Sequence, residues 1–248
     1  MARIALMGKN DIKGVGLKKL RGVWCFAIFL VAISGWNTQS AMASSKGFFD
    51  YNYYTDTRDF NVYTLNLLAN VNSKIQYFSL LNIFNSAGTE ENFDKSLFFS
   101  EQNIRWSVVP DLPYEMTLQW VTQSGNKNDI FRVGTRIRVN DIESLKSLFK
   151  KLNLVYGINF HLLQFDSLTG YQWQIEHGYK IQLIKDLLYL AGFIDHNIDG
   201  SKHTLVTEHQ VGYRMVDQLH IVAEYRFNGY LNKDRSGVGF GLQYLIYF

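Results

Sequence analysis

Charged side chains alternate with large apolar ones along several stretches of this chain, a spacing suited to passing or pairing ions. Arg132, Arg136 and Arg138, for example, are separated by apolar or small residues. Successive side chains of a β-strand point to opposite faces, so these arginines share one face and the apolar residues cover the other. The same division along the chain selects eleven candidate residues: Arg105, Glu115, Arg132, Arg136, Arg138, Glu176, Lys180, Asp195, Glu208, Glu224 and Arg226.

The charged face is expected to lie inside a membrane barrel, because an Arg or Lys facing lipid at mid-membrane costs ~2–4 kcal/mol. Arginines of 97–108 and 129–139 flank Glu115. A second expected group consists of Glu208, Arg214, Glu224 and Arg226. Two interpretations stay open: ion pairs that fill a closed interior, or a polar pore that selects small solutes electrostatically. Asp195 lies in a stretch that is apolar on both faces, so its side of the barrel is ambiguous.

Twelve segments of about ten alternating residues, separated by turn residues, predict the fold. The segments are 47–55, 60–70, 73–84, 97–108, 113–123, 129–139, 152–165, 171–183, 187–196, 203–214, 218–228 and 237–248. The expected fold class is all-β: a single antiparallel transmembrane β-barrel of about 12 strands with one short periplasmic helix. An even strand number places both termini in the periplasm, with the odd-numbered connections extracellular and longer than the even-numbered ones.

The C-terminal segment has a large apolar residue at every second position from Val238 to Phe248. An aromatic terminal residue on such a strand is typical of the closing strand of outer-membrane barrels, which the barrel-assembly machinery recognises. Phe248 is therefore the predicted assembly signal. The alternative is the last strand of a soluble sandwich.

The N-terminal residues 1–43 have the layout of a secretory signal peptide. A cationic stretch ends at Arg21, an apolar run covers 23–33, and the small residues Ala41-Met42-Ala43 precede Ser44. The apolar run is shorter than the ~20 residues of a membrane-spanning helix, which favours cleavage over a permanent anchor. The predicted mature chain, 44–248, is one outer-membrane barrel in a Gram-negative bacterium, in contact with outer-membrane lipid.

The basic balance of the precursor comes from this leader. The whole chain is formally +3, but the leader holds six of its 25 Lys and Arg residues and one of its 22 acids. The mature part therefore carries 19 basic and 21 acidic residues, which gives no argument for nucleic-acid binding. Its one cysteine, Cys25, lies in the leader, so the mature chain is expected to have no disulfide and no thiol chemistry.

Residues 140–152 break the strand pattern and predict the periplasmic helix. Ile142, Leu145, Leu148, Phe149 and Leu152 fall on one helical face. We expect a cap at residue 140 or 141, and two lysines suit the C-terminal end. The helix is expected either to cover or plug the barrel rim or to lie on the inner leaflet.

Catalytic and metal-binding patterns are weak. His177 and His209 fall on the nominally outward face, which invites comparison with lipid-modifying barrels, but no serine stands beside them as a nucleophile. His196 and His203 flank a predicted loop containing Asp199, a weak candidate for a divalent ion. We expect no enzyme activity, no cofactor and no resident metal.

The last sixty residues resemble the nucleoside-specific channel-forming (Tsx/OmpK-like) family. The resemblance rests on the segments 190–195, 224–227 and 236–248. It implies passive uptake of nucleosides, with aromatic side chains stacking bases and polar ones binding ribose. A twelve-stranded barrel lies between narrow, filled barrels of eight strands and open porins of sixteen to eighteen. The expected function is thus a channel, or porin, for small polar solutes such as nucleosides, with a closed structural or surface-interaction barrel as the alternative.

Overall fold

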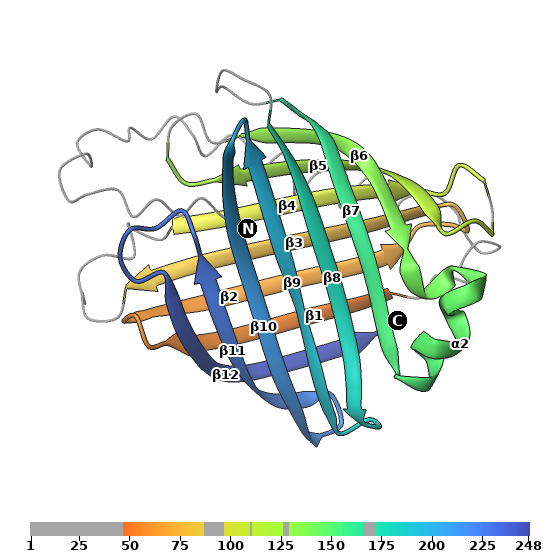
Figure 1. Ribbon diagram of the computed structural model, residues 1–248. Helices are drawn as coiled ribbons and strands as arrows, with labels where there is room; N and C mark the ends of the chain where they lie inside the picture. The colour runs from red at the N-terminus through yellow and green to blue at the C-terminus, as the bar shows by residue number, and fades with distance from the viewer. Residues whose placement is uncertain (1–46, 87–96, 110, 126–128, 166–171) are drawn as a thin grey trace, which may run out of the picture.

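Twelve antiparallel strands close into one barrel in the computed structural model, which describes residues 47–86, 97–109, 111–125, 129–165 and 172–248 (Figure 1). Each strand pairs with its neighbours in sequence, and the last strand pairs with the first. Residues 1–46 lie outside the described residues, so the leader and its cleavage near Ser44 stay predictions. Among the described residues, no helix is both long and apolar enough to cross a membrane.

The twelve strands follow the predicted order, and each bound lies within three residues of its expected position. They are β1 Gly47–Asp56, β2 Phe60–Asn70, β3 Ile75–Ser86, β4 Leu97–Trp106, β5 Tyr114–Gln123, β6 Ile130–Arg138, β7 Leu154–Phe165, β8 Gln172–Ile184, β9 Leu188–Asp199, β10 Lys202–Val216, β11 Leu219–Asn228 and β12 Ser236–Tyr247. The predicted fold class is therefore confirmed.

The seam of the barrel joins the two ends of the described chain. β1 and β12 pair from Phe48 opposite Tyr247 to Asp56 opposite Gly239. Beyond that ladder, the amide of Gly47 donates to the carbonyl of Phe248 at 2.8 Å, and the amide of Phe248 donates back at 3.1 Å. Phe248 thus completes the closing hydrogen bonds. We call this end of the barrel the terminal end, and the opposite one the far end.

Turn lengths differ from the expected parity at the far end. A six-residue loop was expected at 197–202, but β9 and β10 continue to Asp199 and from Lys202, leaving a two-residue turn. Gly200 has φ +57° there, a left-handed conformation that glycine adopts without steric cost. The strands therefore extend further than the polar composition of this loop suggested.

The predicted helix is present as α2, Glu143–Lys151, preceded by a 3₁₀ turn at Val139–Asp141. The expected cap is wrong: Ile142 occupies the N-cap position and provides no side-chain hydrogen bond. The ring of Phe149 stacks on Tyr156 at 6.2 Å between centroids, on the outward side of β7. α2 therefore packs outside the barrel wall at the terminal end and does not plug the lumen (Figure 1).

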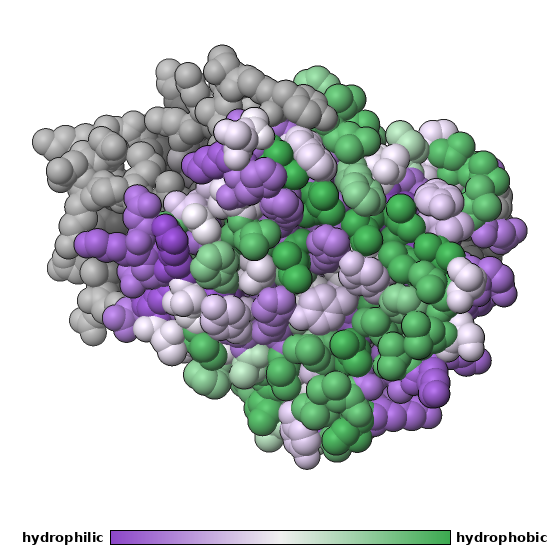
Figure 2. All heavy atoms as spheres, in the orientation of Figure 1, coloured by the Kyte–Doolittle hydropathy of each residue, from purple (hydrophilic) through white to green (hydrophobic). Residues whose placement is uncertain are grey.

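The outward face is largely apolar, as a lipid-facing wall requires. Ile104, Trp106 and Trp120 are among its exposed side chains on β4 and β5. Figure 2 views the barrel from the side of β7 to β10 and shows purple and pale spheres crossing a mostly green surface there. The apolar coat is thus interrupted by polar side chains on the side of β7 to β10.

Candidate functional site

All eleven candidate residues lie at inward-facing strand positions. The ladder registers place Glu115 opposite Arg136, Glu176 opposite Asp195, and Glu208 opposite Arg226. The ambiguity at Asp195 is resolved, since its side chain is 3% exposed and shares the inward face of β9 with Tyr189. That these eleven residues contact a solute stays a prediction.

Glu115 of β5 is the centre of one ion cluster. Arg138 donates to its Oε1 at 2.8 Å, and Arg136 donates to its Oε2 at 3.2 Å, both from β6. Ser107 donates its hydroxyl to Oε1 at 3.2 Å. One buried carboxylate therefore serves two guanidinium groups, as the expectation that arginines flank Glu115 required.

Gln76 of β3 extends this cluster. Its Oε1 accepts from Arg105 at 2.8 Å and from Arg136 at 3.2 Å. Arg105 also places its guanidinium 5.3 Å from the ring centroid of Phe78. A neutral amide thus holds two cations side by side on the wall formed by β3 to β6, where their positive charges reinforce one another.

Arg226 of β11 is the centre of a second cluster with the opposite composition. Its Nε contacts Glu224 and lies 3.6 Å from Glu208 Oε1. The guanidinium lies 5.0 Å from the ring centroid of Tyr54. The expected fourth member, Arg214, is absent from this cluster. β10 carries it toward the terminal end, where it pairs opposite His220 of β11.

Arg132 forms no ion pair with any carboxylate that the structure describes, contrary to the expectation that it flanks Glu115. Its Nη1 donates to Gln119 at 2.5 Å and its Nε donates to Gln164 at 2.8 Å. Gln164 in turn donates to Gln172 at 2.8 Å. Amides therefore fix this buried cation and leave its positive charge uncompensated at short range.

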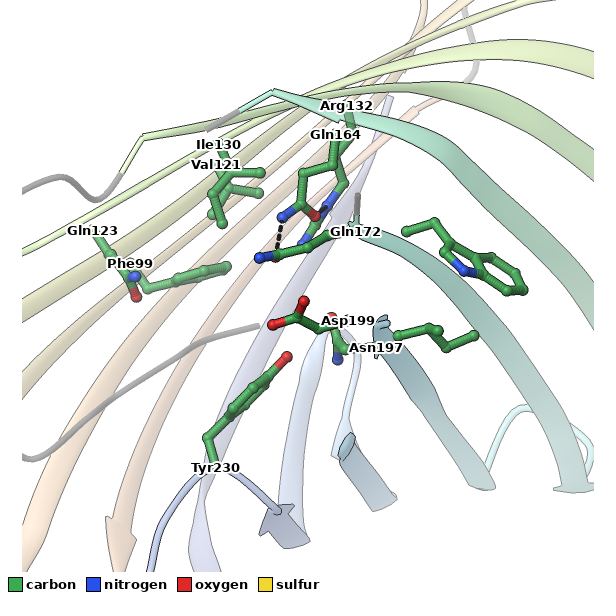
Figure 3. Close-up of a pocket in the computed structure, with 12 residues that line it drawn as sticks. Phe99, Val121, Gln123, Ile130, Arg132, Gln164, Gln172, Asn197, Asp199 and Tyr230 are labelled. Atoms are coloured by element: carbon green, nitrogen blue, oxygen red, sulfur yellow. Dashed lines mark hydrogen bonds between the residues drawn. The ribbon is translucent and has the colours of Figure 1, made fainter. Parts of the chain in front are cut away.

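A small cavity of about 30 Å³ borders Arg132 toward the far end of the barrel. Figure 3 shows Asp199 and Tyr230 turned toward the same space as Gln164 and Gln172. This cavity has about the size that one or two water molecules occupy. The far half of the lumen is therefore narrow beside Arg132.

The other candidates take separate partners. Glu176 lies 3.3 Å from Nε2 of the fully buried His161. Lys180 places its ammonium 4.6 Å from the ring centroid of Tyr189. The charged candidates on β8 to β11 thus form several local arrangements, set by which inward residue each strand offers at a given height.

The candidate residues chosen from the sequence left out the neutral amides, which outnumber the charged candidates on the inward face. They are Asn52, Asn66, Gln76, Asn82, Asn103, Gln119, Gln123, Asn159, Gln164, Gln172, Gln174, Gln182, Asn197, Gln210, Asn228 and Gln243. They share the alternating positions of the charged candidates. The same period-two signal contained them, but charge alone had been used to select candidates.

Asp50 was missed for a different reason: its strand had not been divided into an inward and an outward face. This buried carboxylate accepts hydrogen bonds from Asn52, Gln243 and Asn66, at 2.8, 3.0 and 3.2 Å. Three amides on three strands satisfy it without a cation. It faces inward near the seam.

Several inward polar groups have an atom with no hydrogen-bond partner among the described residues. Examples are Asn82 Nδ2, Asn103 Oδ1, Thr117 Oγ1, Gln119 Nε2 and Gln174 Oε1. A buried polar atom without a partner costs roughly 1–3 kcal/mol, so such atoms favour water or a polar solute beside them. The lumen therefore offers donors and acceptors to a guest molecule.

Part of the inward face is apolar. Phe99, Val121 and Ile130 form one buried cluster and Tyr54, Val62 and Val222 another. Phe84 packs against both clusters. Together they narrow the interior along β1 to β6 and along β11.

The outward histidines pair with tyrosines and form no triad. Tyr156 hydrogen-bonds His177 at 2.7 Å and Tyr179 hydrogen-bonds His209 at 2.6 Å. Tyr179 reaches His209 over Gly192, which the registers place between them. The contacts hold the polar atoms against the wall, and none of them includes a nucleophilic serine.

The candidate metal residues do not assemble. His196 and His203 hydrogen-bond each other at 2.8 Å, while Asp199 faces the cavity near Arg132. No group of three or more potential metal ligands occurs in the part of the chain that the structure describes.

No family model and no curated protein matches the chain. Among solved structures it is similar to the KdgM porin, at 11% identity and a TM-score of 0.51, over 79% of this chain and 98% of that one. For a complex of that porin with disordered oligogalacturonate, the identity is 11% and the TM-score 0.48, over 79% of this chain and 98% of that one. For a triple mutant of the Rhodopseudomonas blastica porin, the identity is 8% and the TM-score 0.36, over 82% of this chain and 99% of that one. The similarity to the KdgM porin shows a porin-like β-barrel fold, and the resemblance to nucleoside-specific channels stays a prediction.

Proposed function

We propose that this barrel is an outer-membrane channel for the passive, selective diffusion of small polar solutes. The observation that carries the proposal is the inward face, where two ion clusters of opposite composition lie on opposite walls, one toward each end of the barrel, among many amides. Glu115 and Arg226 are their centres, and β5 and β11 are six strands apart in a ring of twelve. A wall of this kind attracts dipolar solutes and orients them.

Nucleosides are the first solute class to test. Amide donors and acceptors on the inward face suit the hydroxyl groups of ribose and the edges of bases. The resemblance of 190–195, 224–227 and 236–248 to nucleoside-specific channels supports the same class. The KdgM porin was solved with disordered oligogalacturonate, which makes acidic sugars the second class.

Planar-bilayer conductance tests the proposal directly. The purified barrel is expected to conduct ions and to show concentration-dependent block when adenosine or thymidine is added. An open channel that ignores nucleosides but passes other small solutes keeps the channel and rejects nucleoside selectivity. A protein that inserts and stays silent contradicts the channel itself.

A closed structural or surface-interaction barrel is the second candidate. The observation that favours it is the apolar packing around Phe84, together with the small cavity beside Arg132. Liposome swelling separates the two functions: entry of a pentose into vesicles containing the barrel supports the channel, and swelling no faster than in protein-free vesicles supports the closed barrel.

The proposal includes residence of the mature chain, from about Ser44, in the outer membrane of a Gram-negative bacterium. Phe248 exchanges two backbone hydrogen bonds with Gly47 at the seam. Deleting Phe248 is expected to reduce the yield of heat-modifiable barrel in outer-membrane fractions, both by opening the seam and by removing the assembly signal. Normal yield after the deletion argues against this residue as the signal.

A further inference from the structure

A cavity of about 320 Å³ lies at the terminal end of the barrel, bordered by β8 to β12 and the turns between them. Its volume is at the small end of the ~300–1,000 Å³ range of ligand pockets. Lys180, Tyr189, Arg214 and His220 line it. It is separate from the narrow cavity beside Arg132 and from both ion clusters.

The cations of this cavity differ from those of the clusters. Arg136, Arg138 and Arg226 each contact a carboxylate within 4.0 Å. Neither Lys180 nor Arg214 forms an ion pair with any residue that the structure describes, although both border the same cavity. Cations that lack a protein counter-ion and face a common space favour an anionic guest.

The nearest buried carboxylate does not neutralise them. Asp50 acts on Lys180 only at longer range, and its oxygens already accept from Asn52, Asn66 and Gln243. The ammonium of Lys180 instead lies over the ring of Tyr189. An incoming anion would therefore meet a cation whose charge no adjacent acid has already paired.

Two acids also border the cavity, and the turns themselves account for them. Asp186 and Asp217 have φ of 55° and 38°. Aspartate tolerates this left-handed region better than most residues because its short polar side chain bonds locally. Asp59, Asp111 and Asp234 occupy comparable positions elsewhere in the chain. Lys180 and Arg214 lie on strands, and no such backbone requirement explains them.

Tyr189 and His220 supply the remaining wall. The Nδ1 of His220 donates to the carbonyl of Gln218 at 3.2 Å, because a carbonyl can only accept, and this leaves Nε2 free to contact a guest. The two rings meet edge to face at 5.9 Å between centroids. Both side chains are almost fully buried, so this aromatic pair forms the floor of the cavity beneath the Lys180 ammonium.

We propose that this cavity binds a small organic anion, with a carboxylate or phosphate group paired to Lys180 and Arg214 and its ring against Tyr189. The site deepens the proposed function, since it names the charge class of a solute held at one mouth of the lumen. It rests on that function only for the route by which the solute arrives.

Calorimetric titration of the purified full-length barrel in detergent tests the site. Sodium D-glucuronate is expected to bind at least tenfold more tightly than D-glucose, with D-glucosamine no better than glucose. Lys180→Gln and Arg214→Gln are each expected to weaken glucuronate binding about tenfold, because each removes a charge-assisted contact. Lys180→Arg keeps the charge and is expected to stay within about threefold of the unaltered protein.

Lys185→Gln is the matched control. Lys185 is an exposed lysine in the β8–β9 turn at the same mouth, and it does not line the cavity. It is expected to leave binding unchanged. Equal loss in Lys185→Gln and Lys180→Gln would reduce the effect to general electrostatics and overturn the site. Equal affinities for glucuronate and glucose would overturn the proposal that the guest is an anion. A higher affinity for the zwitterion glycine than for glucuronate would also overturn it.

The binding site and the channel can be contradicted independently of each other. A barrel that binds glucuronate through Lys180 and Arg214 but is silent in bilayers keeps the site and contradicts the channel. A barrel that conducts but shows no glucuronate binding contradicts the site and keeps the channel. Heat-modifiability of each variant on gels confirms that it is folded before either measurement.

Discussion

On β5 and β6 one carboxylate serves two guanidinium groups, whereas on β10 and β11 one guanidinium group serves two carboxyl groups. These two clusters, centred on Glu115 and Arg226, lie on strands six apart in the ring, Glu115 near the terminal end of β5 and Arg226 near the far end of β11. With every group ionised, Glu115 with Arg136 and Arg138 carries a formal charge of +1, and Arg226 with Glu208 and Glu224 carries −1, while Asp141 at the terminal end also pairs with Arg138 at 2.8 Å. The lumen is therefore polarised along a diagonal between the two clusters, with little net charge. Such a field orients a dipolar solute without excluding either sign of ion.

The two clusters also differ in how they can respond when their central residue is replaced. A guanidinium group does not lose its proton in a protein, so two arginines left together stay charged. Two carboxyl groups left together can relieve their repulsion when one takes up a proton. The Glu115 cluster therefore depends on its central ion more strictly than the Arg226 cluster does.

The largest expected effect is the loss of stability in Glu115→Gln. It leaves Arg136 without a carboxylate partner and Arg138 with Asp141 alone, and it is expected to cost about 3–5 kcal/mol, the range for breaking a buried ion pair from one side. Arg226→Gln is expected to cost less at neutral pH, and the difference between the two variants is expected to widen at pH 5, where carboxyl groups gain protons more readily. Urea unfolding in detergent measures both.

Glu143→Gln is the control for this pair. Glu143 lies on α2, 3.7 Å from Lys146, with both side chains exposed to solvent. An exposed pair contributes about 0–1 kcal/mol, so this variant is expected to unfold almost like the unaltered protein. Equal losses in Glu115→Gln and Arg226→Gln at both pH values would show that the clusters are equivalent and reject the proposed asymmetry.

The next expected effect is a change of ion selectivity of opposite sign at the two walls. Replacing Arg132, Arg136 and Arg138 together by Gln is expected to shift selectivity toward cations, and replacing Glu208 and Glu224 together toward anions. A unit charge about 10 Å away in water contributes about 0.4 kcal/mol, roughly a twofold change in local ion concentration per charge removed. Reversal potentials in a salt gradient measure the shift.

Unchanged selectivity in the triple arginine variant would mean that its charges do not face a conducting path. The closed barrel would then be the better account of the interior. Arg132 sharpens this test, because glutamines rather than carboxylates hold it. Arg132→Gln alone is therefore expected to give more of the shift than Arg138→Gln alone.

The smallest expected effect concerns a single hydroxyl in the Glu115 cluster. Ser107→Ala removes the donor 3.2 Å from Glu115 Oε1 and is expected to cost about 0.5–1.5 kcal/mol, one hydrogen bond, in urea unfolding. Thr117→Val is the matched control, since the Thr117 hydroxyl has no partner among the described residues. A larger loss for Thr117→Val than for Ser107→Ala would show that the contact with Glu115 is not what stabilises this wall.

The sequence predicted which residues belong to the candidate site, but not which of them contact one another. Arg132, Arg136 and Arg138 were expected on one inward face, and they lie there. Their partners differ, because Arg132 lies at the height of Gln119 while Arg136 lies at the height of Glu115. A register shift of four residues would place Arg132 opposite Glu115 without altering the alternation of either strand.

Arg214 shows the same limit over a longer distance. Its sequence proximity to Glu208 suggested one group, but six residues along a strand separate their heights by about 20 Å. The amides were overlooked for another reason: an isolated Asn or Gln on an alternating face carries no charge to mark it. Their importance appears only where twelve strands bring them to one interior.

The sequence by itself determined the strand count, the order of the strands and the face of most charged residues, although the face of Asp195 was decided only by the structure. Period-two alternation is a local property of the extended chain, and lipid outside with polar groups inside leaves one consistent choice of face. The tertiary structure alone decided the partners of Glu115 and Arg226, the position of α2 against Tyr156, and the cavity lined by Lys180 and Arg214. Those features depend on register and closure, which join residues far apart in the chain at a common height in the barrel.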